Sequence, residues 1–143
     1  MDVERTIDIT APRDQVWAIV ADVERWPEWT ASVTSIDRLD AGPLQIGSQA
    51  RVRQPGLPVV VWTVTAFDSG RYFEWQNTRL GLKTVGGHRV EGRPGDSTRV
   101  TLSLGWSGYL APLIRLSFGA RSRRYIEMEA EGLKWRCEGN TFT

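Results

Sequence analysis

The stretch of sequence that decides the fold is residues 9–29, which read ITAPRDQVWAIVADVERWPEW. Before it, residues 2–9 alternate between apolar and polar side chains, which is the period of a strand with one buried face. Within it, Pro12 suits the first turn of a helix, and apolar residues then recur at helical spacing. A second short helix is predicted over about 23–29, and Asp22 is placed to cap it. The chain is therefore expected to begin with a strand and two short helices.

Six further strands are predicted downstream, separated by turns rich in Gly, Pro and Asp. They lie near residues 32–39, 47–54, 58–67, 71–77, 83–92 and 98–106. Short turns between consecutive strands indicate hairpins and hence an antiparallel sheet. A long helix is predicted from Pro112 to about Glu138, where Gly139 supplies a stop. This order of elements predicts an α+β domain that spans residues 1–143.

The composition is that of a globular protein, with 41% apolar and 24% charged residues among 143. The 18 basic and 17 acidic residues give a formal charge of +1, which argues against nucleic acid as the main partner. The single cysteine, Cys137, excludes an internal disulfide, and the single histidine, His88, excludes a His-rich metal centre. The glycines are not clustered into a phosphate-binding loop. We predict no metal and no cofactor, and expect a monomer or a homodimer.

Several motifs spread over nearly the whole chain carry a family resemblance. Besides the stretch quoted above, they are Gly47, Phe73-x-Trp75, His88-Arg89-Val90, Thr98-Arg99-Val100-Thr101, Leu110-Ala111-Pro112-Leu113, Arg123-Arg124-Tyr125 and Glu129-Ala130-Glu131-Gly132-Leu133-Lys134. Together they resemble the polyketide cyclase/dehydrase branch of the START-like (SRPBCC) superfamily, which is related in fold to plant pollen allergens. The resemblance implies a helix-grip fold, in which a curved seven-stranded antiparallel sheet wraps around a long C-terminal helix. It also implies a deep apolar cavity for a lipid, a sterol, a polyketide or a similar molecule.

The seven tryptophans and the alternation of the strands suggest where a ligand would lie. Apolar side chains fall on one face of the strands over 58–67, 71–77 and 98–106, and aromatic residues and a Met recur along the last helix. The candidate ligand contacts are Trp29, Trp62, Phe73, Trp75, His88, Trp106, Phe118, Tyr125 and Met128. The same side chains could instead fill an ordinary core.

Two residues are candidates for catalysis. His88 shares strand parity with Val90 and could be a general base, a hydrogen-bonding partner for a ligand carbonyl, or a structural residue. No carboxylate that could orient it is evident in the sequence. Tyr125 lies on the apolar stripe of the last helix and could donate a hydrogen bond to a ligand.

The remaining ionisable groups have less specific roles. Arg51 and Arg53 share one face of a strand and are solvated if Val52 faces the core, but could grip an acidic head group in the opposite register. Arg123 can pair with Glu127 on the last helix, although weak affinity of this basic segment for anionic lipid is also possible. A nucleophilic role for the cysteine near the helix end is disfavoured because no acid or base partner is evident.

Three classes of function fit these observations. The first is binding of a small hydrophobic molecule in an internal cavity, and the second is a polyketide cyclase, aromatase or dehydratase that acts on a ligand held there. The third is a protein-interaction role without a functional cavity. Binding ranks first because the candidate cavity residues are mostly apolar. The N-terminus has no signal-like apolar stretch and no segment could span a bilayer, so we expect a soluble, cytoplasmic protein without integral membrane association.

Overall fold

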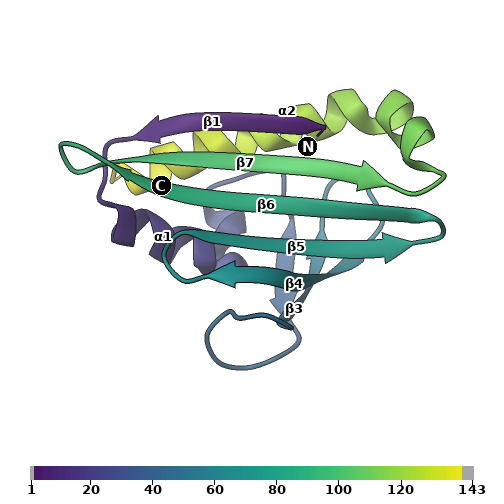
Figure 1. The fold of residues 1–143 in the computed structure, drawn as a ribbon, viewed down its shortest axis with the longest axis horizontal. Coiled ribbons are helices and arrows are strands. Elements are labelled where there is room, and N and C mark those ends of the chain that lie inside the picture. The colour runs from purple at the N-terminus through teal and green to yellow at the C-terminus, as the bar shows by residue number, and fades with distance from the viewer. Residues whose placement is uncertain (1, 140–143) are drawn as a thin grey trace.

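A computed structural model describes residues 2–139 and contains one seven-stranded antiparallel sheet. The strands are β1 (Val3–Ile9), β2 (Ser35–Arg38), β3 (Gln49–Arg53), β4 (Val60–Asp68), β5 (Tyr72–Arg79), β6 (Leu82–Arg93) and β7 (Ser97–Ser107). Their order across the sheet is β1-β7-β6-β5-β4-β3-β2 (Figure 1). Adjacent strands are therefore consecutive in the sequence, with the single exception of β1 and β7. Each strand overlaps its predicted range, which confirms the α+β helix-grip fold.

The sheet buries one face because its strands alternate. Val3, Ile7 and Ile9 of β1 are buried, and so are Val100 of β7, which pairs with Ile7, and Leu102 two residues further along β7. One departure lies in β4, where a bulge after Val64 shifts the pairing with β5. The bulge interrupts the alternation that begins with the buried Trp62 and Val64, so Ala66 is only half-buried.

The two short helices follow β1 as predicted. They are α1 (Arg13–Ala21) and the 3-10 helix η1 (Val23–Glu28). Asp22 stands at the N-cap position of η1, but its carboxylate makes no capping hydrogen bond. It forms an ion pair with Arg25 instead, at 3.4 Å, so the capping prediction is wrong.

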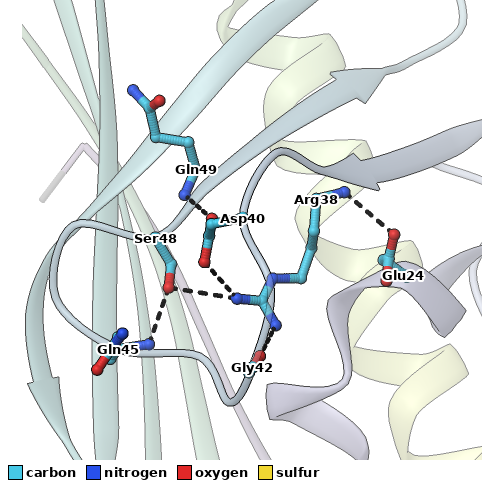
Figure 2. Close-up of polar contacts among 7 residues, drawn as sticks. All are labelled: Glu24, Arg38, Asp40, Gly42, Gln45, Ser48 and Gln49. Atoms are coloured by element: carbon cyan, nitrogen blue, oxygen red, sulfur yellow. Dashed lines mark hydrogen bonds and ion pairs between the residues drawn. The ribbon is translucent and has the colours of Figure 1, made fainter.

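The connection between β2 and β3 is fixed by a polar network around Arg38 (Figure 2). The Arg38 guanidinium donates to Asp40 at 2.6 Å and to Ser48 at 3.4 Å, while its backbone N–H donates to Glu24 of η1 at 3.1 Å. Asp40 also accepts the backbone N–H of Gln49 at 2.7 Å. These bonds tie the start of β3 to η1 and so hold the β2–β3 end of the sheet in place.

The long helix α2 (Ala111–Cys137) runs behind the β1–β7 edge and contacts both strands (Figure 1). Apart from Ala111 at its first position, its buried residues all lie in its second half and are Ile126, Glu129, Ala130, Leu133 and Cys137. Gly132 is essential to this packing, because a Cβ there would lie 2.0 Å from the carbonyl oxygen of Trp29. The predicted Arg123–Glu127 ion pair does not form between these two described residues. Among residues 2–139, no helix is long and apolar enough to cross a membrane.

Candidate functional site

A cavity of about 380 Å³ lies between the sheet and α2. Its wall draws on the six strands β2 to β7, on η1, on the β3–β4 connection and on α2. This volume falls within the range of sites that bind small organic molecules. The wall is mostly apolar, and four of the side chains in it are indoles, from Trp26, Trp62, Trp75 and Trp106.

Three of these indoles form a continuous aromatic wall. The ring centroid of Trp75 lies 5.5 Å from those of both Trp26 and Trp62, and the imidazole of His88 lies 5.3 Å from Trp26. Gly86 on β6 makes room for them, because a Cβ there would lie 3.2 Å from the Trp75 ring. Such tilted and edge-to-face contacts hold the rings in place and leave aromatic surface for a flat ligand.

His88 is the first of two buried ionisable groups in the cavity wall. Its ring stacks on Phe73 with centroids 4.1 Å apart, and its Nδ1 lies 3.2 Å from the Phe73 carbonyl oxygen. A carbonyl only accepts hydrogen bonds, so Nδ1 carries the proton and Nε2 is the acceptor nitrogen. Burial lowers the pKa of His88 to about 4, against the opposing effect of the Phe73 hydrogen bond. The imidazole is therefore neutral at pH 7 and is a hydrogen-bonding group rather than a strong base.

Glu129 of α2 is the second buried ionisable group in the wall. Its carboxylate accepts a hydrogen bond from Ser32 at 3.3 Å, and the Ser32 hydroxyl lies 2.8 Å from that of Thr30. Burial raises the pKa of Glu129 to about 7, and the Ser32 hydrogen bond offsets only part of that effect. Glu129 therefore exchanges a proton near neutral pH, inside an apolar cavity.

The β3–β4 connection is held to α2 by two hydrogen bonds at one side of the cavity. The Tyr125 hydroxyl donates to the Pro55 carbonyl, and the Arg121 guanidinium donates to the Gly56 carbonyl at 3.1 Å. Both carbonyls belong to the loop whose neighbours Gln54 and Leu57 line the cavity. The Tyr125 hydroxyl is therefore hydrogen-bonded within the protein, while its side chain still lines the cavity.

Six of the nine predicted contact residues line the cavity, and three do not. Those in the wall are Trp62, Trp75, His88, Trp106, Phe118 and Tyr125. Trp29 lies against Gly132 just after η1, and Phe73 stacks on His88 and makes a T-shaped contact with Trp17. Met128 of α2 is half-buried and is not among the residues that line the cavity.

Among the wall residues that the sequence interpretation missed, one aromatic and one buried acidic residue matter most for the site. Trp26 falls within the predicted second short helix and was given no role in the site, yet its ring contacts both Trp75 and His88. Glu129 was not singled out, although it falls four residues after Tyr125 and four before Leu133, in line with the apolar side of the helix. An acidic residue at an apolar position is the signal that could have identified it.

Other ionisable residues lie outside the cavity wall. Arg51 and Arg53 are exposed because Val52 faces the core, which resolves their register in favour of solvation. Cys137 is buried, and burial raises the pKa of its thiol to about 12, so it is no nucleophile near neutral pH. Within the described part of the chain, no three His, Cys, Asp or Glu side chains converge as a metal site would require.

The family model described as "Polyketide cyclase / dehydrase and lipid transport" matches residues 1–138. A protein of Streptomyces halstedii with the name "Putative polyketide cyclase" is 33% identical over 94 residues, which cover 64% of this chain and 75% of that protein. These matches agree with the resemblance carried by the sequence motifs.

Solved structures share the fold at low sequence identity. The aromatase/cyclase Zhui of Streptomyces sp. R1128 superimposes with a TM-score of 0.78 at 18% identity, over 95% of this chain and 92% of that one. A START superfamily protein of Mycobacterium smegmatis gives 0.74 at 20% identity, over 95% and 96% of the two chains. A hypothetical protein of Helicobacter pylori superimposes with a TM-score of 0.79 at 16% identity, over 94% of this chain and 86% of that one.

Proposed function

The chain belongs to the polyketide cyclase/dehydrase and lipid transport family, and from this premise we propose that its cavity binds a flat, largely apolar molecule bearing carbonyl or hydroxyl groups. The observation that carries the proposal is the wall of four indoles around a volume of about 380 Å³. Aromatic faces favour flat rings through offset stacking. The Nε2 of His88 can accept a hydrogen bond from a ligand hydroxyl, and protonated Glu129 can donate one to a ligand carbonyl.

Calorimetric titration with a dihydroxyanthraquinone tests the proposal, with palmitic acid as a flexible-chain comparison. We expect the flat probe to bind and Trp75→Ala to weaken it about tenfold or more, because the variant removes one stacking face. Trp17→Ala is the matched control, since Trp17 packs on Phe67 and Phe73 outside the cavity wall and should change affinity less than about twofold. Failure of the wild type to bind, or equal weakening by both variants, would contradict the proposal.

A second candidate function is dehydration or cyclisation of the bound molecule, and Glu129 is the observation that favours it. A carboxyl group whose pKa is raised to about 7 by burial can both give and take a proton at neutral pH. For a β-hydroxy ketone, protonated Glu129 would give its proton to the departing hydroxyl as the C–O bond breaks. The neighbouring carbon then loses a proton to the Glu129 carboxylate, one water leaves and the acid is restored.

Turnover of an aryl β-hydroxy ketone to its conjugated enone, followed by absorbance, separates catalysis from binding. Catalysis predicts that Glu129→Gln keeps the affinity for the flat probe but lowers the rate by about a hundredfold, the usual contribution of a general acid. Glu127→Gln, an exposed neighbour on the same helix, is the matched control. Binding of the flat probe without enone formation by the wild type would leave the protein as a binding module.

Three sequence-based expectations stay predictions beside this proposal. They are a single domain over residues 1–143, a cytoplasmic location, and a monomeric or homodimeric state without a nucleic-acid partner. Each can be measured on the purified protein or in cells independently of the cavity.

A further inference from the structure

Large apolar side chains protrude from the protein around one end of the cavity. Leu80, in the β5–β6 turn, is 80% exposed, and Leu116, in the second turn of α2, is 86% exposed. Tyr109 and Leu113, which flank the start of α2, are 80% and 56% exposed. Figure 1 shows the β5–β6 turn and the start of α2 at the same end of the molecule. We call these four side chains, together with the nearby basic residues Arg79, Lys83, Arg121, Arg123 and Arg124, the mouth surface.

Contacts between the turn and the helix start make the mouth surface continuous. The Tyr109 ring lies over Gly81, where a Cβ would be only 2.2 Å from its Cζ, and the backbone N–H of Leu110 donates to the Gly81 carbonyl at 3.3 Å. Leu80 and Leu110 also line the cavity. The exposed apolar patch is therefore the rim of the cavity itself.

Leu80 adopts a backbone conformation that is unfavourable for a leucine. The two-residue turn from Arg79 to Leu82 has φ of +43° at Leu80 and +78° at Gly81. Asn, Asp or Gly are preferred in the first of these positions, because other side chains are strained at positive φ. A leucine there is strained and exposed at once, so neither local conformation nor core packing explains it.

The segments that surround the mouth surface are basic. The segments 54–60, 77–83 and 105–126, which all contribute to the cavity wall, contain six basic residues and no acidic one. Since the whole chain has 18 basic and 17 acidic residues, the rest of the molecule is net acidic. Of the six, Arg115 is neutralised by an ion pair with Asp2 at 2.8 Å. The others, Arg79, Lys83, Arg121, Arg123 and Arg124, form no ion pair with any residue of the described chain.

The outward side of α2 combines both features. Leu113 and Leu116 are followed at helical spacing by Arg123 and Arg124, so the four residues point away from the sheet. Apolar side chains at the tip with arginines behind them are typical of segments that lie in the interface of a bilayer.

We propose that the mouth surface docks on an anionic lipid bilayer, with Leu80, Leu113 and Leu116 entering the headgroup region. The arginines then contact anionic headgroups, each adding an attraction that salt screens. Single leucines that protrude from a turn and a helix fit a soft surface, whereas a folded partner would need a preformed pocket for each. The inference rests on the proposed function in one respect: docking in this orientation lets an apolar ligand pass between the bilayer and the cavity without crossing water.

Cosedimentation of the full chain with vesicles tests the proposal without any cavity ligand. Vesicles of phosphatidylcholine alone are compared with vesicles that also contain phosphatidylserine, at low and at physiological salt. We expect binding to the anionic vesicles and little to the neutral ones. Arg123→Ser with Arg124→Ser should lower the partition coefficient about 25-fold, from about fivefold per arginine. Leu80→Ser with Leu116→Ser should lower it at least about tenfold.

Two matched pairs of substitutions complete the test. Arg51→Ser with Arg53→Ser removes two exposed arginines of β3, and Leu39→Ser with Ile46→Ser removes two exposed apolar side chains of the β2–β3 connection. Both pairs should leave the partition coefficient within about twofold. Equal binding to neutral and anionic vesicles, no binding to either, or equal losses in the control pairs would overturn the docking proposal. Calorimetric binding of the dihydroxyanthraquinone without vesicles would show that the cavity proposal still stands.

Discussion

The two halves of α2 meet very different surroundings, although they belong to one continuous helix. Its second half, from Ile126 to Cys137, is anchored, because most of its buried side chains and the close approach at Gly132 lie there. Its first half keeps large apolar and basic side chains exposed and touches the β3–β4 connection through two hydrogen bonds. The contrast indicates that stability is concentrated at one end of the helix and ligand access at the other.

The strongest way to break this contrast is to add one methyl group to each half. Gly132→Ala would place a Cβ 2.0 Å from the Trp29 carbonyl oxygen, so the helix must move away from η1. We expect a loss of about 3 kcal/mol or more in the free energy of unfolding, measured in urea. Gly119→Ala is the control, since nothing lies within 4 Å of its Cβ.

Gly119→Ala should stabilise the protein by up to about 1 kcal/mol, because alanine favours a helix over glycine. Alanine gives the same gain in helix propensity at position 132, so Gly132→Ala destabilises the protein only because the clash with the Trp29 carbonyl oxygen costs more than this gain. If both variants were equally stable, the second half of α2 would not be the anchor that the contact with Trp29 implies.

The next largest effect is the pH dependence of stability that arises from the two buried ionisable groups, Glu129 and His88. Their contributions change with pH in opposite directions. Burial holds the pKa of Glu129 at about 7, above its ordinary 4.5, so its contribution to stability falls as pH rises from 4.5 toward 7. Burial holds the pKa of His88 at about 4, below its ordinary 6.5, so its contribution rises with pH between 4 and 6.5. Between pH 4.5 and 6.5 the two slopes nearly cancel in the wild type.

Removing one group should reveal the slope of the other. Over pH 4.5 to 6.5, Glu129→Gln should gain about 2 kcal/mol of stability from the remaining His88, and His88→Gln should lose about 2 kcal/mol from the remaining Glu129. Urea unfolding at several pH values measures both trends. The double variant serves as the control and should follow the wild type. Parallel curves for the two single variants would mean that these groups are not buried as the structure has them.

The elements of the fold were predictable because their physical signals are local. Strand alternation, turn residues and helical spacing depend on neighbours in the sequence, and they identified every strand and both α-helices. The family resemblance then supplied the arrangement of the helix and the curved sheet, which local patterns do not contain.

The wall of the cavity was harder to predict because tertiary packing decides it. Trp26 lies in η1 and Trp29, three residues later, is the residue that caps its C-terminus, so the spacing along a 3-10 helix predicts the same side for both. In the structure, Trp26 lines the cavity whereas Trp29 packs against Gly132, and this difference depends on the position of α2. Glu129 looked like one more solvated acid of a helix, and its burial depends on a sheet that the helix sequence does not encode.

The smallest effect concerns the first half of α2, where the Tyr125 hydroxyl holds the Pro55 carbonyl. Tyr125→Phe keeps the ring in the cavity wall and removes only this hydrogen bond, so the free energy of unfolding should fall by about 1 kcal/mol or less. If the bond holds the loop closed over the cavity, stopped-flow rates for entry and exit of the flat probe should rise together, leaving the dissociation constant almost unchanged. Tyr109→Phe removes the hydroxyl of an exposed tyrosine just before α2 and should change neither rate. A larger dissociation constant with an unchanged entry rate would instead indicate that the Tyr125 hydroxyl bonds to the ligand, as the sequence suggested. The experiment therefore decides whether this half of the helix acts on the ligand directly or through the loop.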